Sequence, residues 1–124
     1  HQSRLSSFKF NPKYTHICQL NSLDSWYDLP TMLLTAFAPF DMIVVDGPGD
    51  DAARICHRAL DLYKTAANYR TIWIVDDSSR PASGWLVGKW LPNWLQTYTA
   101  TNIYDRNYNR ITTVIIPAYN KEGR

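Results

Sequence analysis

Residues 40–80 constrain the fold more than any other part of the chain. Positions 42–45 and 72–75 are each four consecutive apolar residues, which predicts strands within 41–46 and 71–75. Continuous rather than alternating runs are typical of strands covered on both faces, as in parallel sheets flanked by helices. Residues 52–67 carry apolar side chains at helical spacing, which predicts a helix with Arg54 on its polar side. Two strands joined by one helix predict a parallel strand–helix–strand unit with a right-handed crossover.

The flanking segments extend this pattern into an α/β fold. Upstream, residues 14–20 read as a strand and residues 30–38 as a helix. Downstream, residues 82–95 read as a helix interrupted at Pro92. The last two elements are strands 97–104 and 110–117, which form an antiparallel hairpin around a polar loop.

Size and charge narrow the class of protein. The 124 residues fit a single domain, and a net charge of +2 with mixed signs argues against nucleic acid or a membrane as the main partner. No apolar run reaches the roughly 18 residues of a membrane span. The two cysteines, Cys18 and Cys56, have no metal-type partner nearby, which favours thiols in a reducing compartment over a disulfide. We therefore expect a cytoplasmic protein.

Acidic residues follow both strands of the central unit. Asp46 ends the first strand, and Asp76 and Asp77 end the second. Ligands of open α/β sheets bind at the carboxyl ends of strands, where these carboxylates would hold magnesium, bind ribose hydroxyls or act as a general base. Gly47 leaves space for a close approach to this edge. The simpler alternative is that Asp77, or Asp50 after the first strand, only caps the next helix.

Other reactive residue types carry weaker signals. The Gly47–Gly49 turn lacks the spacing of a phosphate-binding loop, so a nucleotide-binding hydrolase is not indicated. Ser78 and Ser79 lack the motif of a nucleophilic serine. His16 and His57 have no nucleophile beside them and are expected to be structural or surface residues.

Taken in order, several segments resemble one enzyme family. FDMIVVDGPG at 40–49, Arg54 in the next helix and IVDDSSR at 74–80 resemble the second half of class I S-adenosylmethionine-dependent methyltransferases. The segment from 14 to 28 is similar to their third-strand region, and the closing hairpin to their reversed last strands. The family's glycine-rich loop and first two strands have no counterpart before Tyr14. The resemblance therefore implies an incomplete Rossmann-like fold, a single partial domain over residues 1–124, completed by a longer chain or by a partner such as a second copy.

The resemblance also implies roles for individual residues. Asp46 and Gly47 match the position beside cofactor and acceptor, with Asp46 as catalytic base. Asn21 and Ser22 match a region near the adenine of S-adenosylmethionine.

A metal site is implied by the same comparison. Members similar to catechol methyltransferases hold magnesium with the residues that match Asp46, Asp76 and Asp77, although Asp77 stands where that family often has Asn. The resemblance implies methyl transfer to an oxygen or nitrogen of a small molecule or saccharide. The alternative function is a non-catalytic interaction module on the same fold, which presents its aromatic-rich surfaces to a partner.

Overall fold

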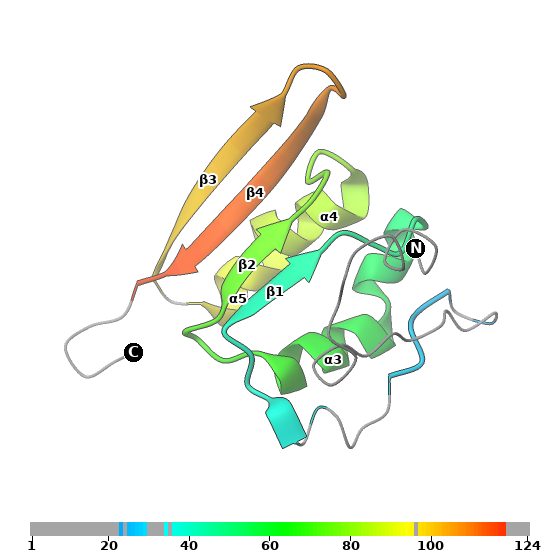
Figure 1. The fold of residues 1–124 in the computed structure, drawn as a ribbon, viewed down its shortest axis with the longest axis vertical. Coiled ribbons are helices and arrows are strands. Elements are labelled where there is room, and N and C mark those ends of the chain that lie inside the picture. Colours follow the sequence, from blue (N-terminus) through cyan, green and yellow to red (C-terminus); the bar gives the residue numbers. More distant parts are fainter. Residues whose placement is uncertain (1–22, 24, 30–33, 35, 96, 119–124) are drawn as a thin grey trace, which may run out of the picture.

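A mixed four-stranded sheet with helices against one of its faces forms the body of the molecule. The computed structural model describes residues 23, 25–29, 34, 36–95 and 97–118. The predicted strand at 14–20 lies outside these residues. Strand order is β1-β2-β4-β3, as Figure 1 shows. The strands are β1 (Met42–Val45), β2 (Ile72–Val75), β3 (Tyr98–Asp105) and β4 (Arg110–Pro117).

The predicted parallel unit is confirmed. Strand β1 pairs in parallel with β2, from Met42 beside Ile72 to Val45 beside Val75. The predicted hairpin is also confirmed, since β3 and β4 pair antiparallel along their whole length. However, β4 also pairs antiparallel with β2, so the expectation of a mainly parallel sheet is wrong. The hairpin folds β4 back into the position beside β2, leaving β3 at the edge.

The helical segment between β1 and β2 is divided in two. A short 3₁₀ helix, η2 (Asp51–Ile55), precedes helix α3 (His57–Ala66), and Cys56 between them is extended. The single regular helix predicted over residues 52–67 is therefore wrong in this detail. Asp50 caps η2 by accepting a hydrogen bond from the Ala52 amide at 3.1 Å, as its sequence position predicts.

The helical segment after β2 is continuous through Pro92. It consists of α4 (Pro81–Trp85), the π-helical turn η3 (Leu86–Trp90) and α5 (Leu91–Trp94). The predicted interruption at Pro92 is absent. Proline cannot donate a backbone hydrogen bond, and the wide π turn directly before it, with the Leu91 amide bonded to the Leu86 carbonyl, accommodates this defect. In the predicted helix 30–38, the described residues Leu34, Ala36 and Phe37 are helical.

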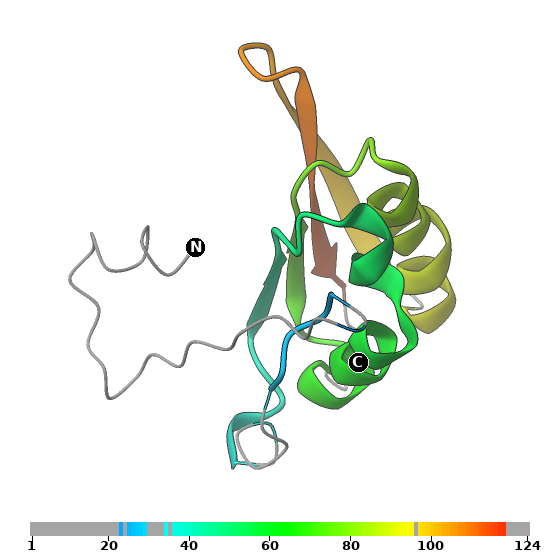
Figure 2. The same cartoon turned by 90° about the vertical axis from the view of Figure 1, so that its right-hand side faces the viewer.

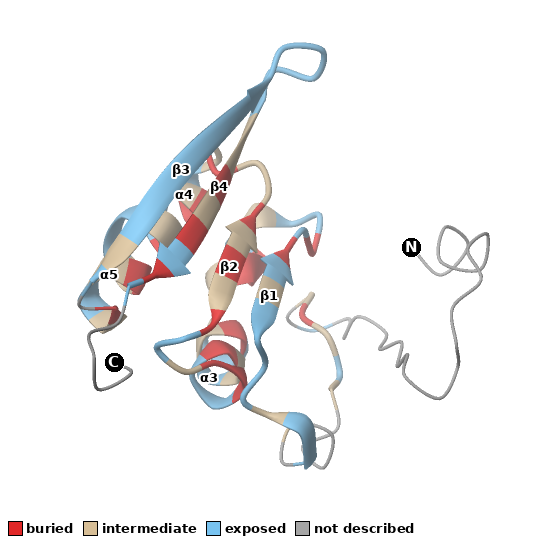
Figure 3. Ribbon diagram, turned by 60° about the vertical axis from the view of Figure 1, so that its left-hand side comes forward, coloured by how far each residue is buried: buried red, intermediate tan, exposed pale blue. Residues whose placement is uncertain are grey.

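The core lies between the sheet and the helices on one side of it, as the turned view in Figure 2 shows. Trp73 of β2 is fully buried there and packs edge to face with Tyr63 and Trp94. On the other face Met42 and Val44 are 51% and 58% exposed (Figure 3). Among the described residues, helices cover one face only, contrary to the expectation for these apolar strands. No helix among those residues is long and apolar enough to cross a bilayer.

Candidate functional site

The two predicted strand-end aspartates lie side by side. Asp46 and Asp76 each follow the last paired residues of β1 and β2, and the Asp76 amide donates to the Val45 carbonyl at 2.9 Å. Thr112 of β4 donates its hydroxyl to Asp76 Oδ1 at 3.2 Å. Parallel pairing of β1 with β2 brings the two carboxyl groups together, and antiparallel pairing of β4 with β2 adds the Thr112 hydroxyl at the same end of the sheet. We call Asp46, Asp76 and Thr112 the acidic rim.

Asp46 is an exposed residue at this edge of the sheet, and its surroundings raise the pKa of its carboxyl group. Burial raises the pKa of the Asp46 carboxyl most, and a hydrogen bond with Asp76 and the negative charge of Asp76 raise it further. The guanidinium groups of Arg54 and Arg110 act in the opposite direction without cancelling the rise. A carboxyl group with a raised pKa beside a second carboxyl group can accept a proton from a ligand, and the two together can bind a cation.

Gly47 is predicted to leave space for a ligand, and the structure fills that space with Tyr27. A Cβ atom built on Gly47 would lie 2.5 Å from the Tyr27 hydroxyl oxygen. Burial raises the pKa of Tyr27, and so does the charge of Asp46 beside it, whereas Arg54 lowers it. The protonated hydroxyl of Tyr27 therefore stands next to the acidic rim. The missing side chain at Gly47 is the only sequence feature that pointed to this contact.

Asp77 is directed to neighbours other than the acidic rim. Its carboxylate accepts a hydrogen bond from the Ser79 hydroxyl at 3.2 Å and lies 3.8 Å from Arg80 Nε. Its backbone φ of +52° places it in the left-handed region. Helix α4 is instead capped by Asp51, which accepts from the Ala82 amide at 2.7 Å. The capping role considered for Asp77 is therefore wrong, whereas Asp50 caps η2, the helix that follows its own strand.

The rim fits a hard cation only in part. Asp46 and Asp76 supply carboxylate oxygens, and magnesium commonly takes one or two protein carboxylates and completes its shell with water. In the part of the chain that the structure describes, no group of three or more Asp, Glu, His or Cys side chains is arranged to hold a metal. The three-aspartate site that the resemblance implies thus has at most two of its members at the rim.

The remaining predicted residues lie away from the rim or outside the described residues. Asn21, Ser22 and His16 are outside them. His57 is an exposed residue of α3 that pairs with Asp61 at 3.1 Å, which agrees with its predicted surface role. Cys56 is a half-buried free thiol.

One residue near the rim was assigned wrongly by the helical pattern. Arg54 was expected on the polar side of the helix, but it is 4% exposed. Its Nε donates to the Pro48 carbonyl at 3.0 Å and its Nη1 to the Asp76 carbonyl at 3.0 Å. These bonds connect the loops that carry both rim aspartates. Only its place in the motif, seven residues beyond Gly47, could have drawn attention to it.

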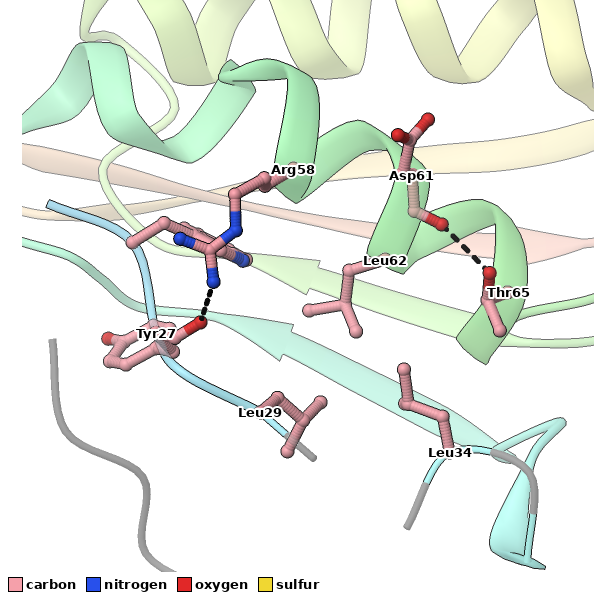
Figure 4. Close-up of a pocket in the computed structure, with 8 residues that line it drawn as sticks. Tyr27, Leu29, Leu34, Arg58, Asp61, Leu62 and Thr65 are labelled. Atoms are coloured by element: carbon pink, nitrogen blue, oxygen red, sulfur yellow. Dashed lines mark hydrogen bonds between the residues drawn. The ribbon is translucent and has the colours of Figure 1, made fainter. Parts of the chain in front are cut away.

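A separate hollow lies between residues 26–29 and helix α3 (Figure 4). It has a volume of about 240 Å³, and its lining includes Leu29, Leu34 and Leu62. Arg58 closes one side by donating to the Tyr27 carbonyl at 3.1 Å. The lining also includes Arg58 and Asp61, which are paired with Asp28 and His57, and none of the residues predicted for the functional site lines this hollow.

Comparisons with known proteins add no assignment to this geometry. The chain matches no family model, no curated protein sequence and no solved structure.

Proposed function

We propose that this chain forms the carboxyl-terminal part of a class I S-adenosylmethionine-dependent methyltransferase domain. The observation that carries the proposal is the pair of carboxyl groups, Asp46 and Asp76, at the carboxyl ends of neighbouring parallel strands. In α/β sheets this is the edge where ligands bind. The acceptor is a small molecule or saccharide with a nucleophilic oxygen or nitrogen, and a longer chain supplies the glycine-rich cofactor loop.

The order of the strands supports the same proposal. Strand β4 lies antiparallel between β2 and β3, so the sheet ends in a reversed strand pair after its parallel strands. That arrangement is what the resemblance to the family implies for its last two strands. Fold alone does not assign an activity, and the proposal therefore depends on the chemistry of the acidic rim.

Asp46 has the properties of a general base for an acceptor hydroxyl. S-adenosylmethionine, when bound, supplies an electrophilic methyl group on a sulfonium. The Asp46 carboxylate would hold the acceptor hydroxyl and accept its proton when this methyl group is transferred to the oxygen. A raised pKa makes Asp46 a stronger base than an ordinary aspartate. Orientation of the acceptor against the rim supplies most of the acceleration.

Two residues refine this picture. With S-adenosylmethionine bound, Asp46 and Gly47 would lie beside it, and Tyr27 already occupies the space next to Gly47. Where a magnesium ion takes part, Asp46 and Asp76 would be its protein ligands. The free thiol of Cys56 supports a cytoplasmic setting for the reaction.

Calorimetry with S-adenosylhomocysteine tests the proposal directly. We expect the longest natural form of the chain to bind it, and Asp46→Asn to weaken binding about tenfold through loss of a charged hydrogen-bond acceptor. Asp41→Asn is the matched control, because Asp41 lies at the opposite end of the same strand. Absence of binding heat in the native form would reject the enzyme.

A second candidate is a non-catalytic interaction module. The observation that favours it is the uncovered sheet face, where Val44 and Ile116 are 58% and 49% exposed. Apolar patches of this kind mark association sites in many proteins. A second copy of the chain is the partner, so light scattering should give a dimer that Val44→Asp converts to a monomer. A monomeric native chain would exclude this candidate.

A further inference from the structure

Arg54 is the only charged side chain that is buried in the part of the chain described. It is 4% exposed and lies in η2, between the sheet and the start of α4. A guanidinium stays charged at all physiological pH values, and its removal from water is costly unless its N–H groups find acceptors. The burial of Arg54 must therefore be compensated by hydrogen bonds from its guanidinium.

The contacts of Arg54 join three separate segments. Nε donates to the Pro48 carbonyl at 3.0 Å, in the loop after β1. Nη1 donates to the Asp76 carbonyl at 3.0 Å, at the end of β2, and to the Ser83 hydroxyl at 3.1 Å, in α4. Because a guanidinium is planar and rigid, these bonds fix the three segments relative to one another.

The acceptors lie next to the acidic rim. Pro48 is two residues after Asp46, and the second carbonyl belongs to Asp76 itself. Arg54 is held from behind as well, because the buried Tyr63 hydroxyl donates to its carbonyl at 2.8 Å. The backbone of Arg54 is thus held by Tyr63, and its guanidinium is bonded to the two loops that carry Asp46 and Asp76.

We propose that Arg54 is a positioning residue, whose guanidinium ties the loops after β1 and β2 together and so sets the placement of the Asp46 and Asp76 carboxyls. The inference rests on the proposed function of the acidic rim. Arg54 itself acts through the two loops, and its contribution is geometric.

Two variants and one control separate this role from general stability. Arg54→Lys keeps the charge and loses the planar group. Ser83→Ala removes one of the three contacts while leaving Arg54 in place, and it also removes the hydrogen bond from the Ser83 hydroxyl to Asp51 at 3.0 Å. The control is Thr71→Val. It removes the buried hydrogen bond from the Thr71 hydroxyl to the Phe40 carbonyl, 2.7 Å long, which joins the amino ends of the same two strands.

Native-state hydrogen exchange gives the first measurement. The reporters are the Ala82 amide, bonded to Asp51, and the Asp76 amide, bonded to Val45, against the Ile72 amide at the other end of the strands. Arg54→Lys should speed exchange at Ala82 and Asp76 about tenfold relative to Ile72. Ser83→Ala should speed exchange at Asp76 several-fold, and Asp76 is the reporter for this variant because the lost Ser83–Asp51 bond affects Ala82 directly. Thr71→Val should instead affect Ile72 most. An equal change at all three amides in the Arg54 and Ser83 variants would overturn the proposal.

The affinity for S-adenosylhomocysteine gives the second measurement, taken where all variants are folded. Arg54→Lys should weaken it about tenfold, as for a lost charge-assisted hydrogen bond, and Thr71→Val should leave it unchanged. Equal affinity of native and Arg54→Lys chains would overturn the positioning role. If the native chain does not bind, the proposed function fails, and the exchange pattern alone then decides whether Arg54 holds the rim.

Discussion

The contact between Gly47 and Tyr27 yields a sharp test of the site. Gly47→Ala would place a Cβ atom 2.5 Å from the Tyr27 hydroxyl oxygen, whereas the closest ordinary carbon–oxygen contacts are about 3.3 Å. Either the ring of Tyr27 or the loop after β1 must therefore withdraw by about 0.8 Å. Overpacking of this kind costs about 1–3 kcal/mol. Because the end of a side chain moves more easily than backbone, we expect about 1–2 kcal/mol.

The second variant removes the obstacle without removing the ring. In Tyr27→Phe the nearest atom to the new Cβ is the ring carbon Cζ, at 3.8 Å, which is an ordinary contact. Gly47→Ala should then cost almost nothing. A double-mutant cycle should give a coupling energy of about 1–2 kcal/mol between the two positions.

Gly49→Ala is the matched control. A Cβ atom there meets no atom within 4 Å, and the substitution should stabilise the fold by about 0.4–1 kcal/mol, because alanine restricts the unfolded chain. Urea unfolding followed by far-ultraviolet circular dichroism measures all the variants. An equal cost of Gly47→Ala in the tyrosine and phenylalanine backgrounds would show that Tyr27 does not occupy this space, and the geometry given for the rim would be wrong.

Three further predictions concern the rim, the helices and the core. The pKa of Asp46 is raised in the folded state, so its contribution to stability is present at acid pH and lost as the pH rises through that pKa. Asp46→Asn should therefore be more stable than the native chain at pH 7 but not at pH 3, by a small margin because solvent screens this exposed group, and urea unfolding at each pH measures the difference. Gly84→Ala should destabilise the fold by about 1 kcal/mol, because its Cβ would lie 3.0 Å from the Ser78 carbonyl oxygen. In Gly88→Ala the new Cβ meets no atom within 4 Å, so this variant should stabilise the fold by about 0.5–1 kcal/mol. Thermal unfolding that ranks the two variants in the opposite order would contradict this prediction. Trp73→Ala should lower the free energy of unfolding in urea by about 3–5 kcal/mol, because Trp73 is fully buried. Trp73→Phe should lower it clearly less, because Phe keeps an aromatic ring and the buried indole N–H that it removes has no hydrogen-bond partner among the described residues. Equal losses for the two variants would refute this prediction.

Part of the site followed from local sequence. The runs at 42–45 and 72–75 are too apolar and β-branched to be anything but strands once a helix separates them, and their parallel pairing was correct. Parallel strands end at the same edge, so Asp46 and Asp76 had to meet there. The partner of each aspartate was therefore predictable without any long-range information.

The error at Arg54 has a local cause as well. The prediction applied a period of 3.6 residues to the whole segment, but its first turn is a 3₁₀ helix with 3.0 residues per turn, and Cys56 is extended. The positions of the apolar residues in α3 therefore do not predict which residues of η2 face the core. Arg54 turns inward, where acceptors from two loops and α4 compensate its charge.

What the sequence alone determined is the secondary structure around residues 40–80, the closing hairpin and the pair of aspartates at one sheet edge. These depend on side-chain pattern and on turn residues, which act over a few positions. Tertiary structure decided the placement of β4 between β2 and β3, the position of the Tyr27 hydroxyl against Gly47 and the burial of Arg54. Each of these depends on contacts between segments 20 or more residues apart in sequence or on the exact turn geometry, and, unlike the β1–β2 pairing, none follows from a strand–helix–strand pattern.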